Sequence, residues 1–221
     1  MKDLTLVIPA KFEPESLPKV LDELKKYNFK ISVILHSSDT KTIKSIKKYK
    51  VKVIKQKNKG YGDAIIQGIY QCKTDFFCIF NADGSFNPSE IKYMMKSLNK
   101  NKLDFIFASR YEKNSGSDDD TWVTYIGNYF FTKIGNIFFN LPITDILYTF
   151  VLGKTNSAKK LNLTQKNFSF CVELPIKAKR QNMKIASIAS FERKRIAGKK
   201  KVNEIKDGII ILIYIIKFFF K

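Results

Sequence analysis

The sequence is poor in cysteine and in acidic residues. Its three cysteines, Cys72, Cys78 and Cys171, form an odd set without the spacing of a metal site, and each lies in an apolar segment. We therefore expect reduced thiols in the core of a cytosolic protein. The 20 Asp and Glu residues stand against 40 Lys and Arg, and the net charge of +20 favours an anionic partner: a nucleic acid, an acidic membrane face or a phosphorylated substrate.

Long hydrophobic runs are also missing. Met1–Pro9 leads straight into a strand-like segment, so no signal peptide is predicted there. The apolar run Ile209–Ile216 is interrupted by Lys217, and it is shorter than the about 20 residues that a bilayer span needs. We expect this C-terminal helix to lie in the membrane interface, with Lys217 and Lys221 reaching lipid phosphates. Packing on the domain, or truncation of a longer tail, are the alternatives.

The first half of the chain alternates short apolar runs with stretches of helical spacing. This alternation predicts an α/β domain with a parallel, doubly wound sheet, in which ligands bind beyond the carboxyl ends of the strands. Strands are expected at Leu4–Ile8, Ile31–Leu35, Val51–Ile54, Phe76–Phe80 and Leu103–Ala108, and helices at Glu15–Tyr27, Thr40–Tyr49, Ala64–Cys72 and Pro88–Leu98.

The second half is more aromatic and mostly helical. A long helix is predicted at Thr121–Leu141, followed by a helix at Phe168–Arg180, a strand at Lys184–Ala189 and a closing helix from Val202. No internal repeat or linker interrupts the 221 residues, which fit one domain.

One apolar strand ends in residues that could bind a metal ion. The segment FFCIFNADGSF, residues 76–86, delivers Asn81 and Asp83 to the carboxyl end of its strand. Alternate side chains share a face of a strand, so the two point the same way and could bind Mg²⁺ or Mn²⁺ through oxygen atoms. Such a cation would neutralise charge on a departing nucleoside diphosphate. The alternative is a plain turn, for which Asn, Asp and Gly are common residues.

Six sequence blocks follow one another across nearly the whole chain: LVIPAKFEPESLPKVL, NKGYGDAIIQGI, NADGSFNP, FASRY, ITDILYTF, and FCVELPIKAKRQNMKIASI with RKRIAGKKKVN. In this order and spacing they resemble a family 2 glycosyltransferase of the dolichyl-phosphate mannosyltransferase type. The resemblance implies a GT-A type, Rossmann-like, mostly parallel sheet flanked by helices, with a C-terminal amphipathic or apolar helix. It divides the single domain into a nucleotide-sugar-binding half at 1–110, an acceptor half at 111–200 and a membrane-proximal helix at 201–221.

The resemblance also assigns donor-site residues. Asp83 is the expected main ligand of Mg²⁺ or Mn²⁺, with Asn81 and Ser85 beside it, and Arg195 and Gly198 belong to a loop that closes over the donor phosphates. Arginine suits that role because its planar fork binds phosphate oxygens in pairs. The expected donor-binding set comprises Pro9, Ala10, Glu13, His36, Asn81, Ala82, Asp83, Ser85, Arg110, Arg195 and Lys201.

Three departures from the family pattern concern the donor. Phe12 stands where the family usually has Asn before the first-loop Glu. The segment ILHSSDT replaces an Asp pair that reads the base and ribose, which leaves His36 or Asp39 as the substitute. Asn81 replaces the first metal Asp; it keeps an oxygen ligand but loses a negative charge. The donor base is therefore left open.

The acceptor is expected to be a polyprenyl or dolichyl phosphate. Its phosphate is already anionic and needs positioning and charge screening more than a general base. The expected catalytic residues are Asp83, Asp145 and Arg195, with Asp145 orienting the acceptor or the sugar, or acting only as a cap or turn residue. The aromatic segment Trp122–Phe139 either contacts lipid or forms core. The acidic run Asp118–Asp120 resembles a mobile acceptor loop or is a plain cap.

These expectations describe an enzyme that passes a hexose, mannose or glucose, from a nucleoside-diphosphate sugar to lipid phosphate. It would be cytoplasmic and peripheral at the inner face of the cell membrane. A weakened family member that binds lipid or a protein, and a glycosyltransferase with a non-lipid acceptor, are the alternatives. A nucleotidyltransferase is disfavoured because PAKFEPES replaces its Gly-rich loop. No nucleic-acid motif is found, so nucleic acid is not an expected partner.

Overall fold

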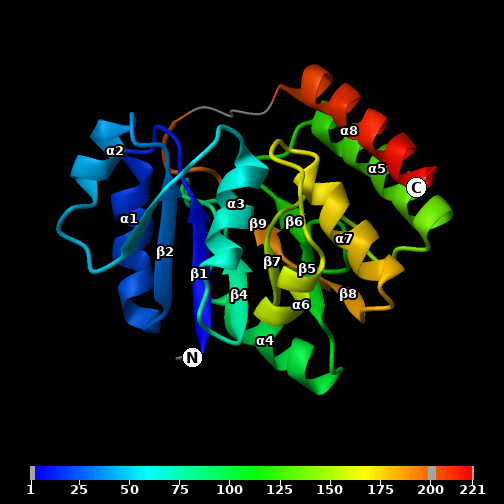
Figure 1. The fold of residues 1–221 in the computed structure, drawn as a ribbon, viewed down its shortest axis with the longest axis horizontal. Coiled ribbons are helices and arrows are strands. Elements are labelled where there is room, and N and C mark those ends of the chain that lie inside the picture. The colour runs from blue at the N-terminus through cyan, green and yellow to red at the C-terminus, as the bar shows by residue number, and fades with distance from the viewer. Residues whose placement is uncertain (1–2, 199–202, 221) are drawn as a thin grey trace.

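The computed structural model describes residues 3–198 and 203–220, and its core is a seven-stranded sheet with the order β3-β2-β1-β4-β7-β5-β8 (Figure 1). Its strands are β1 (Leu4–Pro9), β2 (Lys30–Leu35), β3 (Lys52–Lys55), β4 (Phe76–Ile79), β5 (Phe105–Ser109), β7 (Val151–Lys154) and β8 (Ile185–Ala189). All neighbours pair in parallel except β7, which runs antiparallel to β4 and β5. The predicted α/β fold with a mostly parallel sheet is confirmed.

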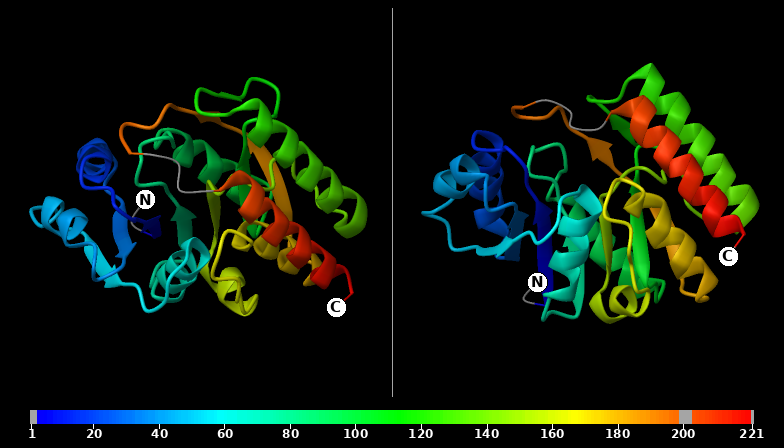
Figure 2. Two further views of the ribbon diagram at one scale, coloured as in Figure 1. Left: turned by 90° about the horizontal axis from the view of Figure 1, so that it is seen from above. Right: turned by 45° about the horizontal axis from the view of Figure 1, so that its top comes forward.

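Helices cover both faces of the sheet (Figures 1 and 2). Side chains alternate between the faces, as the strand period of two requires: Leu6 and Ile8 of β1 join the core on one face, whereas Val7 joins the core on the other. The first core includes α1 (Ser16–Leu24) and α4 (Glu90–Lys100). The second includes α3 (Tyr61–Tyr70), α5 (Trp122–Phe139), α6 (Thr155–Lys160), α7 (Phe170–Arg180) and α8 (Glu204–Phe219).

Two short elements differ from the sequence expectation. The helix expected at Thr40–Tyr49 ends earlier, as α2 (Thr40–Ser45), and the helix expected at Glu15–Tyr27 ends as α1 followed by a 3-10 turn (Lys25–Tyr27). In both, closely spaced lysines and a tyrosine follow the last regular turn. The three cysteines are buried and free, and burial raises the pKa of the Cys72 thiol to about 11.

A second, two-stranded sheet crosses above the carboxyl ends of the main strands. It pairs β6 (Gly116–Ser117) with β9 (Phe191–Glu192), in parallel. The pairing fixes the segment between β5 and α5 against the segment that follows β8. Two segments 75 positions apart in the sequence thus meet over the same end of the sheet.

The helices α5 and α8 lie side by side along one edge of the molecule (Figures 1 and 2). Thr121 caps α5 through a reciprocal hydrogen-bonded box with Thr124, and the Asn203 side chain caps α8 by accepting from the Lys206 amide. None of the helices in the described ranges is long and apolar enough to cross a membrane. The expected C-terminal helix corresponds to α8, while Val202 and Lys221 fall outside the described residues.

Candidate active site

The end of β4 turns sharply at the residues predicted to bind metal. The Asp83 Oδ1 atom accepts hydrogen bonds from the Ser85 amide at 3.0 Å and the Ser85 hydroxyl at 2.7 Å. Gly84 makes the turn possible, because its φ of +85° belongs to the region that favours glycine and an added Cβ would lie 2.4 Å from Ile196 Cδ1. The turn leaves the second carboxylate oxygen of Asp83 directed at the loop that contains Arg195.

Asn81 and Ala82 support this turn from the sheet side. The Asn81 side chain accepts from the Tyr61 hydroxyl at 3.3 Å and donates to the Ser85 hydroxyl at 3.3 Å. Tyr61, on α3, also shares a 2.6 Å hydrogen bond with Thr149, and burial raises the pKa of its phenol. Asn81 thus links Tyr61, the first residue of α3, to Ser85, and the neighbouring Ala82 is buried.

Arg195 lies beside Asp83. Its guanidinium nitrogen Nη2 is 3.6 Å from Asp83 Oδ2 and 3.1 Å from Asp119 Oδ2. Burial opposes the charged form of Arg195, but the Asp119 hydrogen bond and the Asp83 charge outweigh it and raise its pKa. Arg193, which precedes it, instead donates to Glu23 at 2.9 and 3.0 Å and so belongs to the scaffold.

A cleft of about 290 Å³ lies between two loops: the first loop, which joins β1 to α1, and the late loop, which follows β9 and contains Arg195 and Gly198. Glu13, buried in its wall, accepts from the Ser16 hydroxyl at 2.6 Å and approaches Gly198, whose absent Cβ would lie 3.4 Å from Glu13 Oε2. The cleft is therefore bordered by both loops that the sequence assigns to the donor. Its lining residues are Phe12, Glu13, Pro14, Glu15, Ser16, Asp39, Lys41, Ala197 and Gly198.

The remaining first-half residues lie at neighbouring strand ends. Pro9 ends β1, and the Ala10 amide donates to the Ile34 carbonyl at 2.9 Å, which continues the strand pairing into the loop. The His36 Nδ1 atom shares a 2.7 Å hydrogen bond with the Ser38 hydroxyl. Asp39 is buried and accepts from the Phe12 and Thr42 amides at 2.6 and 3.2 Å, so its carboxylate caps α2 and holds the first loop.

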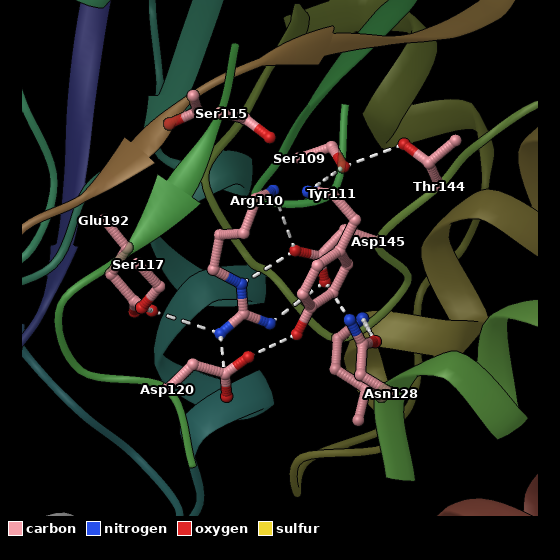
Figure 3. Close-up of polar contacts among 12 residues, drawn as sticks. Ser109, Arg110, Tyr111, Ser115, Ser117, Asp120, Asn128, Thr144, Asp145 and Glu192 are labelled. Carbon is pink, nitrogen blue, oxygen red and sulfur yellow. Dashed lines mark hydrogen bonds and ion pairs between the residues drawn. The ribbon is translucent and has the colours of Figure 1, made fainter. Parts of the chain in front are cut away.

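Arg110 and Asp145 form a buried ion pair (Figure 3). The Arg110 side chain binds Asp145 through two nitrogens, Nε at 2.7 Å and Nη2 at 3.0 Å, and its backbone amide donates to the same carboxylate at 3.1 Å. Asn128 of α5 adds a fourth donor at 2.5 Å. Asp145 is fully buried, so it does not face an acceptor as expected; its carboxylate is occupied by Arg110 and α5.

Arg110 also contacts the two-stranded sheet of β6 and β9. Its Nη1 atom is 3.1 Å from Glu192 and 3.8 Å from Asp120, and its guanidinium lies over the Tyr148 ring at 4.7 Å. Burial raises the pKa of the Glu192 carboxyl, although the Arg110 charge opposes this. Arg110 therefore links β9, through Glu192, to the Asp145 carboxylate that Asn128 of α5 also binds. Only a tenth of its side chain is exposed, which leaves little surface for a diphosphate.

Sequence reasoning missed Asp119 and Glu192 as residues of this region. Asp119 belongs to the acidic run that the sequence did single out, but its partner Arg195 lies 76 positions away. Glu192 carries no local pattern, and its interaction with Arg110 spans 82 positions. Lys201 lies outside the described residues.

The Asp83 turn offers few protein ligands to a divalent cation. Across residues 3–198 and 203–220, no group of three or more His, Cys, Asp or Glu side chains could hold a metal ion. Asp83 supplies one carboxylate, whose Oδ1 atom accepts from the Ser85 hydroxyl and whose Oδ2 atom lies 3.6 Å from Arg195. This donor set fits Mg²⁺ or Mn²⁺ bound through one carboxylate and completed by substrate phosphates and water, a common mode for these ions.

Solved structures share this architecture. Glucosyl-3-phosphoglycerate synthase from Mycobacterium tuberculosis, in complex with Mn²⁺, uridine diphosphate and glucosyl-3-phosphoglycerate, matches with a TM-score of 0.76 at 12% identity, over 97% of this chain and 78% of that one. Mannosyl-3-phosphoglycerate synthase from Rubrobacter xylanophilus matches with a TM-score of 0.74 at 13% identity, over 98% and 73%. The fold is that of the GT-A glycosyltransferases.

The family follows from the sequence comparison. The model of "Glycosyl transferase family 2" matches residues 5–161, and the chain belongs to that family. The expected resemblance and the expected enzyme class, a glycosyltransferase, are thereby confirmed.

Similar proteins include glycosyltransferases whose names give no acceptor and others that are named for a dolichyl phosphate acceptor. A glycosyltransferase from Mycobacterium bovis is 23% identical over 95% of this chain and 94% of its own length. A dolichol-phosphate mannosyltransferase from Pyrococcus furiosus is 30% identical over 55% of this chain and 36% of its own length. A UDP-N-acetylglucosamine–dolichyl-phosphate N-acetylglucosaminyltransferase from Methanococcus voltae is 24% identical over 85% and 84%.

Proposed function

We propose that this glycosyltransferase moves a hexose from a nucleoside-diphosphate sugar to a polyprenyl phosphate, as a peripheral protein at the inner face of the cell membrane. The observation that carries the proposal is that the Asp83–Arg195 site and a half-exposed apolar helix face are joined by one short segment, residues 112–121. Relatives described as dolichyl-phosphate glycosyltransferases support the choice of acceptor.

The donor is assigned to the cleft between the first loop and the late loop. The nucleotide would lie against Pro9, Ala10 and Glu13, with its diphosphate reaching Asp83 and Arg195. Mg²⁺ or Mn²⁺ bound there, with Asp83 as protein ligand, would supply positive charge to the leaving diphosphate. Arg195 donates to the same phosphate oxygens, so the chain itself provides a fixed cation where negative charge develops.

The state of Asp145 favours a phosphate acceptor over a hydroxyl. A hydroxyl acceptor needs a base to remove its proton, and Asp145 is the acceptor-side carboxylate that the sequence indicated. It is fully buried and paired with Arg110, so it holds α5 in place without facing a substrate. A phosphate monoester needs no base: its oxygen can attack the anomeric carbon while the nucleoside diphosphate departs in line.

The membrane surface is assigned to α5 and α8. On α8, large apolar side chains are exposed at the helical spacing of one stripe, while Ile211, Ile215 and Phe218 form a second, buried stripe. The exposed stripe continues onto α5 where the Phe138 and Phe219 rings meet at 5.4 Å. The exposed set comprises Trp122, Val123, Tyr125, Ile126, Tyr129, Phe130, Ile137 and Phe138 of α5, and Ile205, Ile209, Ile213, Ile216, Phe219 and Phe220 of α8 or its end.

Lysines next to these stripes favour an anionic bilayer. Lys133 lies over the Tyr129 ring at 5.4 Å and Lys217 over the Tyr214 ring at 5.3 Å, so both ammonium groups sit on aromatic surface at the edge of the apolar face. Side chains of this kind can lay their stems on apolar surface and reach lipid phosphates with their charge. The face thus combines the two attractions that hold a protein in the headgroup region.

A transfer assay tests the proposal. Radiolabelled GDP-mannose, UDP-glucose and UDP-N-acetylglucosamine are each incubated with Mn²⁺ and three acceptors: polyprenyl phosphate in anionic vesicles, 3-phosphoglycerate, and none. We expect label in the lipid extract for one donor, with none in the Asp83→Ala variant. Label in 3-phosphoglycerate alone would mean that the acceptor is a soluble phosphate and not a lipid. No transfer with any donor and acceptor would refute the proposed activity.

A further inference from the structure

The donor-binding charges of the proposed site are already occupied by the protein's own groups. A single nitrogen of Arg195, Nη2, lies between Asp83 at 3.6 Å and Asp119 at 3.1 Å. The Arg195 guanidinium therefore lies beside Asp83, the carboxylate that would hold the cation. The Asp119 carboxylate in turn lies beside Arg195, which would hold the donor phosphates.

We propose that Asp119 is a positioning residue that takes the place of the donor diphosphate on Arg195 and is released when the donor binds. The proposal rests on the proposed function, since it takes Arg195 as a ligand of the diphosphate. It adds to that site a residue, Asp119, that donor binding alone does not require.

The segment that carries Asp119 is held by main-chain pairing to β9 and by side-chain hydrogen bonds and ion pairs. The Asp118 amide donates to the Glu192 carbonyl at 2.9 Å, and the Asp119 amide donates to the Ser117 hydroxyl at 3.1 Å. Three consecutive carboxylates, Asp118–Asp120, repel one another at this short separation. Asp119 pairs with Arg195, and Asp120 with Arg110 at 3.8 Å; these ion pairs offset the repulsion as long as the segment keeps its position in the structure.

Release of Asp119 would reach the acceptor side directly. Asp120 follows in the chain, accepts from the Tyr111 hydroxyl at 2.5 Å and from the Thr121 amide at 3.1 Å, and so borders the first turn of α5. Trp122, the first residue of α5, begins the exposed apolar face. While the acidic run stays between the site and that face, its charge repels an incoming phosphate; once the donor has taken Arg195, the run is free to move away.

The exchange is energetically accessible. The side chains of Arg195 and Asp119 are each about one-fifth exposed, at 20% and 18%. Ion pairs with this much solvent contact shift an equilibrium by about fivefold at most. A diphosphate with its cation offers Arg195 a more highly charged partner, and one whose oxygens match the planar guanidinium fork. A bound donor can therefore displace the carboxylate.

Calorimetry with a matched pair of variants tests the proposal. UDP and GDP are each titrated, with Mn²⁺, into wild type, Asp119→Asn, Asp118→Asn and Asp119→Glu. Asp118 is exposed in the same run, so Asp118→Asn makes the same charge change without touching the Arg195 contact. We expect Asp119→Asn to bind the preferred nucleotide about threefold to fivefold more tightly than wild type. Asp118→Asn should stay within about twofold of wild type, since an exposed charge is screened, and Asp119→Glu should restore wild-type affinity.

Hydrogen exchange of a peptide covering residues 112–125 supplies a second readout. Without nucleotide, Asp119→Asn should exchange faster there than wild type and Asp118→Asn, and wild type should reach the same rate once nucleotide is bound. Equal affinities for the two Asn variants, or unchanged exchange in Asp119→Asn, would overturn the release of Asp119 while leaving the donor site intact. Failure of wild type to bind either nucleotide would overturn the proposed donor site, and the role of Asp119 with it.

Discussion

The backbone amide of Ile196 donates a 2.8 Å hydrogen bond to the carbonyl oxygen of Asp83. A second bond, from the Arg193 amide to the Ser85 carbonyl at 2.8 Å, makes the late loop run alongside the end of β4. The loop is thus held by main-chain bonds at the position where Arg195 meets Asp83. Loop geometry and metal-ligand geometry are therefore coupled, and a change in one should disturb the other.

Gly84→Ala should reveal this coupling. An alanine must adopt the positive φ of Gly84, which costs about 1 kcal/mol or more, and its Cβ would collide with Ile196 Cδ1. We expect nucleotide affinity to fall more than about tenfold while the fold survives, as checked by calorimetry and circular dichroism. Adding Ile196→Ala should recover the steric part of the loss. Unchanged affinity in Gly84→Ala would show that the turn and the loop are independent.

Asp145→Asn should destabilise the protein strongly. The substitution leaves Arg110 buried with one neutral partner, and breaking a buried ion pair costs about 3–5 kcal/mol. The free energy of unfolding in urea measures the loss. Asp22→Asn, which removes one carboxylate from an exposed pair with Lys25, is the control and should change stability little. Similar effects of the two variants would mean that the Arg110–Asp145 pair does not hold the two-stranded sheet and α5 together.

Glu192→Gln should change the pH dependence of stability. Burial raises the pKa of Glu192 above its ordinary value of 4.5, so the folded protein keeps this proton to higher pH than the unfolded chain does. In that window the folded state binds more protons, and stability falls as pH rises. The difference in unfolding free energy, wild type minus Glu192→Gln, should therefore decrease from pH 4 upward. An increase would mean that the Arg110 charge, and not burial, sets the pKa.

Membrane binding should depend on the exposed face of α5. We expect Trp122→Ala with Ile126→Ala to reduce partitioning into anionic vesicles by at least about tenfold, because each large side chain contributes about 1.5–3 kcal/mol when fully buried. Co-sedimentation measures the partitioning. Tyr93→Ala on α4, which removes an exposed aromatic side chain from another part of the surface, should leave it unchanged. Equal loss in both variants would argue against a docking role for this face.

The sequence predicts those parts of the fold that local pattern controls. The strands β1, β2, β4 and β5 coincide with apolar runs to within a few residues, and the NADGSF turn was located because strand and glycine signals are adjacent. The strand β7 was missed: its four residues carry no distinctive periodicity, and its antiparallel pairing with β4 and β5 joins segments far apart in the chain.

Charge pairing is the part of the site that the sequence could not supply. Asp145 and Arg110 are 35 positions apart, and both were expected to face substrate. Each was assigned by its place in a block that resembles the family, FASRY for Arg110 and ITDILYTF for Asp145, and such a match does not distinguish a buried pair from a substrate contact. The choice between the two depends on the second sheet, whose two-residue strands β6 and β9 are too short to be read from the sequence.

Electron paramagnetic resonance of Mn²⁺ tests the central claim, that Asp83 and a donor diphosphate bind one cation together. Free Mn²⁺ is measured with wild type and Asp83→Ala, each with and without the nucleoside diphosphate that wild type prefers. We predict that wild type binds Mn²⁺ about tenfold or more tightly with nucleotide than without, and that Asp83→Ala loses this gain. Equal nucleotide-dependent binding by both proteins would contradict the account.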